Sequence, residues 1–237
     1  NFGLNRYDGQ HVDILTRETH HLSTNTIYAL YLDINQNLWV IHGDVAKSPV
    51  TAIDIIDPIS FQVQSLEQYV HGELPFSLSD IQTITTDSLH QLCLTVKNTD
   101  VFRFDGQTIK HIIHLPDSKE SITLGLSRKY IYTIAVHDDS MDVWTIDGKW
   151  LSRHATPKLV DASGNQLDWL PIGALNDTQQ IFTGFSLSGS AYYAIAGPDG
   201  FSSIKPYPIQ GYNADLNVIP YQKRIWLSNE NSQISLD

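Results

Sequence analysis

The sequence is poor in cysteine, in basic residues and in long apolar runs, and each shortage excludes a class of protein. Cys93 is the only cysteine, so the chain forms no intrachain disulfide and no cysteine-rich zinc module. It carries 15 basic and 26 acidic residues, and this net charge of −11 argues against binding to nucleic acid or to an anionic membrane surface. No apolar stretch reaches the roughly 18 residues of a membrane-spanning helix.

No signal peptide precedes Asn1, but this excludes no location for the protein. The chain opens within a motif that recurs further along, so we expect it to be a piece of a longer or processed polypeptide.

Short stretches with a period of two residues fill most of the chain. Hydrophobic residues make up 41% of the 237 positions, which is enough for a buried core. The aromatic residues lie mostly within β-branched runs, a composition that suits pleated sheets. No segment follows the helical period of 3.6 residues for more than a turn or two. These features predict an all-β protein.

Two unlike stretches, 27–40 (IYALYLDINQNLWV) and 81–94 (IQTITTDSLHQLCL), carry the same residue types at matching positions. Asp33 matches Asp87, and the Leu-Trp-Val triplet that starts at Leu38 matches the Leu-Cys-Leu triplet that starts at Leu92. We expect each Asp to end the first strand of a unit and to accept backbone N–H bonds in the following turn. A structural role is therefore the better interpretation of these carboxylates than a catalytic one.

Asp-Gly pairs mark turns between strands, because both residues tolerate a positive φ. They recur at Asp8, Asp105, Asp147 and Asp199, and an Asp-Pro turn at Asp57 fits the one gap. Four short strands in each unit of about 40 to 50 residues are typical of a β-propeller blade.

The predicted fold is a β-propeller of four-stranded antiparallel blades, in one domain over 1–237. We expect five blades, closed by residues 10–16 as the outer strand of the last unit, and the alternative is part of a larger ring. The fourth strand of the first complete blade is expected within 61–70. The approximate blades are 1–25 (partial and ring-closing), 26–78, 79–119, 120–168, 169–212 and 213–237.

The segment 22–40 (LSTNTIYALYLDINQNLWV), preceded by 3–9 (GLNRYDG), resembles the two-component regulator propeller repeat. The similarity continues in 79–107 and is faint beyond residue 120. Two positions depart from that family's pattern: Gln36 stands where a Gly is usual, and Cys93 stands where the second unit would have Trp.

This resemblance implies a ligand-sensing module without catalytic residues of its own. Relatives of this kind are extracytoplasmic, periplasmic parts of bacterial membrane signalling proteins, so the implied partners are a membrane-embedded signalling region and a small polar ligand or oligosaccharide. A homodimer is expected of sensors in general. Two alternatives stay open: a protein-interaction propeller without a small ligand, and a five-bladed carbohydrate-active enzyme.

The ten histidines do not form an evident metal motif. The adjacent His20 and His21 should point in opposite directions, and so should His111 and His114, which are three apart on a predicted strand. Residues 136–142 (VHDDSMD) suit calcium by composition, but a solvated acidic loop is the better interpretation. We therefore predict no metal and no cofactor.

Catalytic motifs are also missing. The segment 184–190 (GFSLSGS) fails the spacing of a nucleophile elbow, because Ser188 occupies the second Gly position. Four acidic residues lie near loops where a glycosidase would need a carboxylate pair, but the sequence does not give their separation: Asp44, Asp100, Asp138 and Asp168. We predict that the chain is not an enzyme.

Propeller geometry predicts where a ligand would bind. Loops from outer to inner strands, and from second to third strands, share one face around the channel, and here they are rich in His, Asp and Asn. The candidate ligand-binding residues are His21, His42, Asp44, Asn98, Asp100, His137, Asp138 and Trp169.

Overall fold

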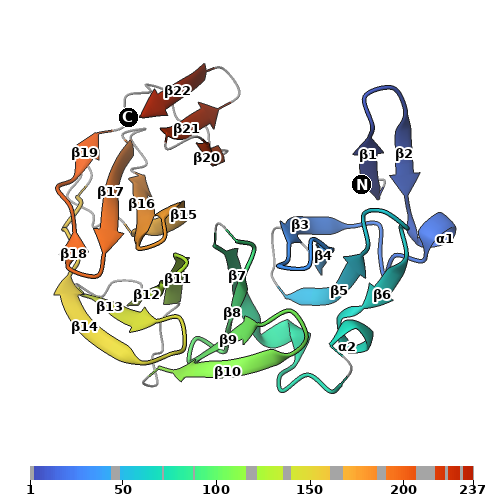
Figure 1. Ribbon diagram of the computed structural model, residues 1–237, viewed down its shortest axis with the longest axis horizontal. Coiled ribbons are helices and arrows are strands. Elements are labelled where there is room, and N and C mark those ends of the chain that lie inside the picture. Colours follow the sequence, from blue (N-terminus) through green and yellow to red (C-terminus); the bar gives the residue numbers. More distant parts are fainter. Residues whose placement is uncertain are drawn as a thin grey trace. The chain divides into compact units, whose positions relative to one another are not determined.

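Short antiparallel strands make up nearly all the secondary structure in the computed structural model (Figure 1). The chain divides into two compact units, residues 1–114 and 115–237. The structure describes residues 3–43, 49–70, 72–87, 89–115, 122–135, 140–160, 168–185, 191–206, 217–221, 224–229 and 232–236.

The first unit holds two four-stranded antiparallel sheets, which we call blades one and two, and a hairpin. The hairpin pairs β1 (Leu4–Tyr7) with β2 (Val12–Leu15). Blade one comprises β3 (Ile27–Leu32), β4 (Leu38–Gly43), β5 (Val50–Ile56) and β6 (Val63–Ser65). Blade two comprises β7 (Ile81–Thr86), β8 (Leu92–Val96), β9 (Asp100–Phe104) and β10 (Ile109–His114).

The second unit repeats this plan in blades three and four and ends in a three-stranded sheet. Blade three comprises β11 (Ile122–Leu126), β12 (Tyr130–Ala135), β13 (Ser140–Thr145) and β14 (Trp150–Ala155). Blade four comprises β15 (Leu170–Asn176), β16 (Gln179–Phe185), β17 (Ala191–Gly197) and the short pieces β18 (Gly200–Phe201) and β19 (Lys205–Pro206). The last sheet comprises β20 (Asn217–Tyr221), β21 (Arg224–Asn229) and β22 (Ser232–Leu236).

The predicted all-β architecture of four-stranded blades is confirmed. Three four-stranded sheets, the five-stranded sheet of blade four and the last three-stranded sheet fit a count of about five. One expected strand differs. Within 61–70 only β6 is extended, and the helix α2 (Leu66–Tyr69) follows at once. Ser65 caps this helix, because its hydroxyl accepts the N–H of Gln68 while the Gln68 side chain accepts the N–H of Ser65. Closure of the ring by residues 10–16 and the single domain stay predictions.

Two further helices are short. The helix α1 (Arg17–His20) has Thr16 as its N-cap, and the 3₁₀ helix η1 (Leu78–Asp80) leads into β7. No helix in the described ranges is long and apolar enough to cross a membrane.

Alternating apolar residues build the core between blades one and two. Trp39 of β4 is fully buried, and its ring lies 5.2 Å from that of Phe104 on β9. The opposite face of blade one packs Val40 and Ile56 against Leu15 of the hairpin. Both faces of the blade are therefore covered, which a lone sheet cannot achieve.

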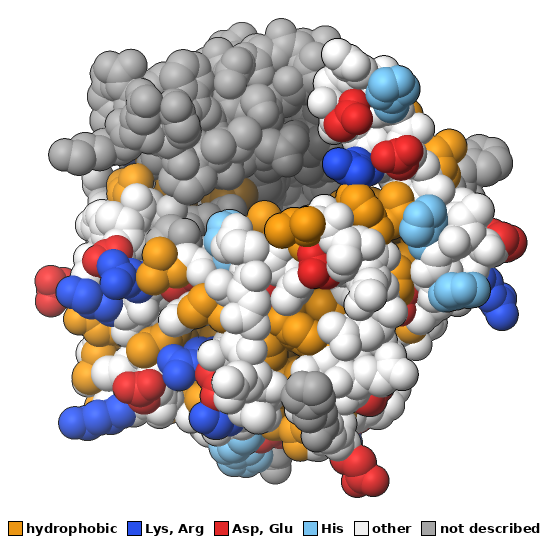
Figure 2. All heavy atoms as spheres, turned by 45° about the vertical axis from the view of Figure 1, so that its right-hand side comes forward, with side chains coloured by type: hydrophobic (Ala, Val, Ile, Leu, Met, Phe, Trp, Pro, Cys, Tyr) orange, Lys and Arg blue, Asp and Glu red, His pale blue; other side chains and the backbone are white. Residues whose placement is uncertain are grey.

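Some apolar side chains of the first unit stay exposed. Figure 2 shows hydrophobic side chains reaching the surface among charged ones. On the hairpin they include Tyr7 (69% exposed), Val12 (60%) and Ile14 (49%), and on β3 they include Tyr28 (52%).

The turns after β3 and β7 explain the repeat. Asp33 Oδ1 accepts the backbone N–H groups of Asn35 and Asn37, each at 2.9 Å. Asp87 Oδ1 accepts those of Leu89 and Gln91 in the same way, at 2.8 and 2.9 Å. The predicted role of both carboxylates is confirmed.

The same turns explain why glycine is usual where Gln36 stands. Gln36 has φ 66°, and the corresponding His90 has φ 61°. Both residues adopt the left-handed conformation that glycine enters without steric cost. The chain therefore forms the same turn with Gln36 and His90 in place of the glycine that would adopt this conformation most easily.

The exchange of Trp for Cys has a further consequence. In blade one, Asp33 Oδ2 accepts the indole N–H of Trp39 at 2.9 Å and the hydroxyl of Tyr69 at 2.7 Å. In blade two, Cys93 occupies the position of the Trp, and Asp87 Oδ2 is buried without a hydrogen-bond partner. Burial raises the pKa of the Cys93 thiol to about 12, so this side chain is a small neutral core residue.

In the second unit, blades three and four approach closely at strands β11 and β16. Phe182 of β16 packs edge-on against Tyr132 of β12, with ring centroids 6.4 Å apart. Gly125 of β11 lies so near this ring that an added Cβ would come within 2.7 Å of Phe182 Cζ. Glycine is thus required at position 125 by contact rather than by φ.

Candidate functional site

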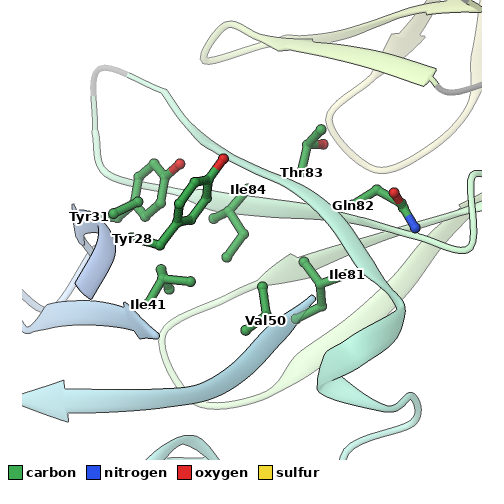
Figure 3. A pocket seen from close by; sticks show the side chains of 9 residues that line it. Tyr28, Tyr31, Ile41, Val50, Ile81, Gln82, Thr83 and Ile84 are labelled. Atoms are coloured by element: carbon green, nitrogen blue, oxygen red, sulfur yellow. The ribbon is translucent and has the colours of Figure 1, made fainter. Parts of the chain in front are cut away.

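A pocket of about 180 Å³ opens between blades one and two (Figure 3). The first strands of the two blades, β3 and β7, supply most of its wall. Its lining comprises Tyr28, Ala29, Tyr31, Ile41, Val50, Ile81, Gln82, Thr83 and Ile84.

The two tyrosines give this pocket an aromatic wall. Figure 3 shows the rings of Tyr28 and Tyr31 side by side, with Ile41 and Ile84 next to them. Tyr28 is half exposed, whereas burial and the neighbouring Tyr28 raise the pKa of Tyr31 above its ordinary value. The two phenol hydroxyls can act as hydrogen-bond donors beside an apolar surface.

Polar groups come from β7. Gln82 is exposed and offers both an amide donor and a carbonyl acceptor. The hydroxyl of Thr83 lies 2.6 Å from that of Thr95, which holds it in place. The volume is below the roughly 300 Å³ of pockets that enclose a drug-sized ligand, so the pocket fits one ring or one small polar molecule.

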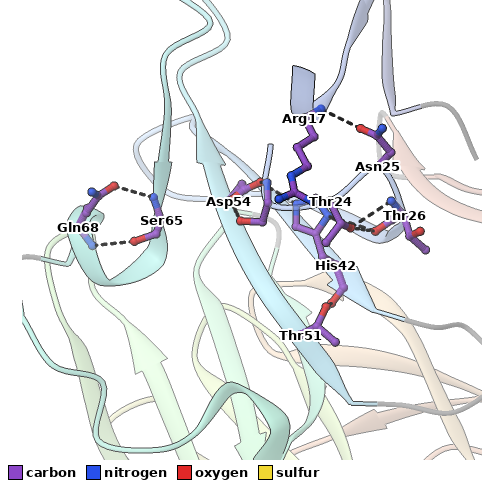
Figure 4. Close-up of polar contacts among 10 residues, drawn as sticks. Arg17, Thr24, Asn25, Thr26, His42, Thr51, Asp54, Ser65 and Gln68 are labelled. Atoms are coloured by element: carbon purple, nitrogen blue, oxygen red, sulfur yellow. Dashed lines mark hydrogen bonds and ion pairs between the residues drawn. The ribbon is translucent and has the colours of Figure 1, made fainter. Parts of the chain in front are cut away.

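His42 belongs to a buried polar cluster rather than to an exposed loop (Figure 4). Its Nε2 lies 2.8 Å from Asp54 Oδ2, and the backbone N–H and the hydroxyl of Ser23 donate to the same carboxylate at 2.7 and 2.6 Å. Burial opposes ionisation of Asp54, but the bonds from His42 and Ser23 outweigh it and lower the pKa of this carboxyl.

This cluster fastens the segment before β3 to the second and third strands of blade one. Both side chains of the His42–Asp54 pair are almost inaccessible, at 0% and 3% exposure. A ligand arriving from solvent does not reach them, so the expectation that His42 lines a ligand site is corrected. The strand β4 is buried on both faces from Trp39 to His42, so His42 is interior and Asp54 compensates for its burial.

Asp100 is the first residue of β9, directly after the β8–β9 turn, and it has neighbours that the sequence did not indicate. Its Oδ1 lies 2.7 Å from His111 Nε2 and 2.9 Å from His114 Nδ1. The prediction that His111 and His114 face opposite sides is therefore wrong. A register shift between His111 and Ile113 introduces a β-bulge, and the extra residue brings both imidazoles to one side.

The remaining candidates are scattered. His21 is exposed at the end of α1, with φ 59°, and Asn98 lies in the β8–β9 turn, also with φ 59°. Trp169 is 4% exposed, packs 5.6 Å from Phe201 and donates its indole N–H to the Pro157 carbonyl. It is a core residue, so its predicted role as an exposed aromatic platform is corrected. Asp44, His137 and Asp138 lie outside the described residues.

Sequence reasoning missed the lining of the pocket, although β3 carried a signal. In 27–32 (IYALYL) both alternating sets are apolar, whereas a half-buried strand should have one polar set. A strand with two apolar sets is typical of a sheet that is covered on both faces, and β3 lines the pocket with residues of both sets.

Comparisons with known proteins support the fold alone. No protein family and no curated protein matches this sequence. A catalytically inactive virginiamycin B lyase from Staphylococcus aureus, solved with quinupristin, is 15% identical with a TM-score of 0.58, and the match covers 95% of this chain and 68% of the lyase. The four-stranded antiparallel blades and this likeness define the chain as a β-propeller.

Two further solved structures align less closely. One is an extracellular domain described as part of a one component system from B. thetaiotaomicron, 14% identical with a TM-score of 0.45, over 94% of this chain and 25% of that one. The other is the WD40 domain of SCAP from fission yeast, 12% identical with a TM-score of 0.46, over 90% of this chain and 53% of that one.

Proposed function

We propose that this propeller is the ligand-sensing, extracytoplasmic domain of a bacterial membrane signalling receptor, and that it binds a small polar ligand in the pocket between blades one and two. The composition of that pocket carries the proposal. Its described lining combines two tyrosines with Gln82 and Thr83, and it holds no carboxylate, histidine, lysine or cysteine. Such a lining can recognise hydroxyl-rich molecules but has no acid–base pair for chemistry.

The ligand class follows from the same side chains. Aromatic rings pack on the apolar face of a sugar, while amide and hydroxyl groups pair with its hydroxyls. The volume accommodates one sugar ring, so an oligosaccharide would insert one unit and leave the others outside.

The signalling part of the proposal rests on the repeat resemblance. The turns at Asp33 and Asp87 and the following strands reproduce the pattern of 22–40 as a structural unit. The resemblance supports a periplasmic location, an attached membrane-embedded signalling region and a homodimer.

Thermal unfolding against a panel of oligosaccharides, amino acids and nucleotides tests the proposal. A ligand at about 100 times its dissociation constant adds about 2.7 kcal/mol, which should raise Tm by roughly 5 to 10 °C for a chain of this size. We expect one sugar class to shift the wild type and to leave a Tyr28→Ala, Gln82→Ala variant unshifted. A panel that shifts neither protein contradicts the small-ligand function.

A second candidate function is a protein-interaction propeller, favoured by the exposed Tyr7, Val12 and Ile14 on the hairpin. Such side chains are typical of a surface that another protein covers. Substitution of all three by Ser would then abolish partner binding and leave any ligand-induced Tm shift unchanged.

A further inference from the structure

We propose that Asp100, His111 and His114 form a binding site for one divalent transition-metal ion of the Zn²⁺ class. The three side chains lie at one end of blade two, two of them on β10 and one at the start of β9. Their ligand atoms all lie within 4.8 Å of one another. None of these residues lines the pocket between the blades, so this site is distinct from the proposed ligand site.

The bulge at Ile112 creates the arrangement. His111 is opposite Phe102, Ile113 is opposite Val101, and His114 is opposite Asp100. Ile112 has no partner on β9, so His111 and His114 are placed like residues i and i+2 of a regular strand. That spacing places two imidazoles on one side, where a single ion can reach both.

The donor set suits Zn²⁺ and its neighbours in the first transition series. Two imidazole nitrogens and one carboxylate oxygen are ligands that Zn²⁺ takes at about 2.0 to 2.2 Å, and Co²⁺ and Ni²⁺ accept the same set. Here Nε2 of His111 and Nδ1 of His114 already converge on Oδ1 of Asp100 at 2.7 and 2.9 Å. A metal ion placed among these atoms requires small rotations of exposed side chains.

Neighbouring groups hold the ligands in place. The hydroxyl of Thr99 donates to Asp100 Oδ2 at 2.8 Å, which fixes the carboxylate and leaves Oδ1 directed at the imidazoles. The rings of Phe102 and His111 pack edge to face with centroids 5.1 Å apart, and Phe76 packs on Phe102 at 4.8 Å. Supporting contacts of this kind orient metal ligands in proteins.

The exposure of the three groups leaves room for further ligands. Asp100 is 27% exposed, His111 46% and His114 65%. Three protein ligands leave at least one coordination position for water or for an oxygen atom of another molecule. An exposed ion pair contributes little stability by itself, so folding alone gives no strong reason for this convergence.

Titration of tag-free protein with Co²⁺ and Zn²⁺ tests the site. Co²⁺ should give the visible absorption of a site with nitrogen and oxygen ligands at one equivalent per chain, and calorimetry should report the Zn²⁺ affinity. Asp100→Asn and His114→Gln should weaken binding more than about 100-fold, because the loss of an outer-shell partner alone costs roughly 10- to 100-fold. Thr99→Val, which removes only such a partner, should fall within that smaller range.

His20→Gln is the matched control, because His20 is a partly exposed histidine outside the site, and its Nδ1 contacts the hydroxyl of Thr19. It should bind both ions as the wild type does. Circular dichroism establishes that each variant is folded. The proposal is overturned if the wild type binds no ion at one equivalent, or if binding survives in the Asp100→Asn and His114→Gln variants.

Discussion

At the scale of single residues, two aspartates in equivalent turns have different surroundings. Asp33 accepts four hydrogen bonds, from two backbone N–H groups, the Trp39 indole and the Tyr69 hydroxyl. Asp87 accepts two, because Cys93 offers no comparable donor and Oδ2 is left without a partner. The Asp33 turn of blade one is therefore held by two more side-chain hydrogen bonds than the Asp87 turn of blade two.

Replacement of each aspartate by alanine measures this difference. Asp33→Ala leaves two additional donors unpaired, the buried Trp39 indole and the partly buried Tyr69 hydroxyl. A buried unpaired donor costs about 1 to 3 kcal/mol. We expect the free energy of unfolding to fall by about 1 to 3 kcal/mol more in Asp33→Ala than in Asp87→Ala. Urea unfolding of the two variants gives both values, and equal losses would contradict the assigned hydrogen bonds.

At the scale of elements, strand periodicity predicted most of the blades but not their irregularities. The turn signals at Asp57 and Asp105 lie within a few residues of the strands that they separate, so local sequence is sufficient to place those strands. The bulge at Ile112 and the helix α2 depend on contacts that alternation does not encode. His111 and His114 were consequently assigned to opposite sides, although they share one carboxylate.

The close contact between blades three and four depends on the absence of a side chain at Gly125. An added Cβ would lie 2.7 Å from Phe182 Cζ and 2.9 Å from Gln180 Cγ, both in a well-packed region. Gly125→Ala should therefore lower stability by about 1 to 3 kcal/mol, a range typical of overpacking.

Gly173→Ala is the control, because its Cβ would have no heavy atom within 4 Å. It should change the thermal midpoint little. If both variants lose the same stability, the close approach of β11 to β16 is not what limits position 125.

At the scale of the whole molecule, the sequence indicated the class of fold better than the site. Short-range signals repeat along the chain and define blades, whereas the pocket joins Tyr28 to Gln82 and the buried cluster joins Ser23 to Asp54. Such pairings depend on strand register, which a single sequence does not reveal. His42 and Trp169 were therefore selected as polar and aromatic loop residues, but packing buries both.

The buried His42–Asp54 pair makes global stability depend on pH. The folded pKa of Asp54 lies below its ordinary value of 3.8, so its contribution is present above that value and is lost as pH falls through the folded pKa. Asp54→Asn should cost about 1 to 3 kcal/mol at pH 7, because the amide nitrogen replaces a buried acceptor oxygen and leaves a donor unpaired. The difference from the wild type should shrink below about pH 4.

Asp13→Asn is the comparison, since its pair with Arg6 is exposed and contributes little. Urea unfolding at pH 7 and pH 3 reports the change for each variant. A constant difference between wild type and Asp54→Asn across this range would show that ionised Asp54 does not stabilise the fold.

The central claim is that a ligand contacts the tyrosines between blades one and two, and NMR of ¹³C-tyrosine-labelled protein tests it most directly. The chain has 11 tyrosines, and Tyr28→Phe and Tyr31→Phe assign the two relevant signals. On titration with the sugar class that raises Tm, the signals of Tyr28 and Tyr31 should shift together while that of Tyr192 does not. Shifts confined to tyrosines outside the pocket would contradict the account.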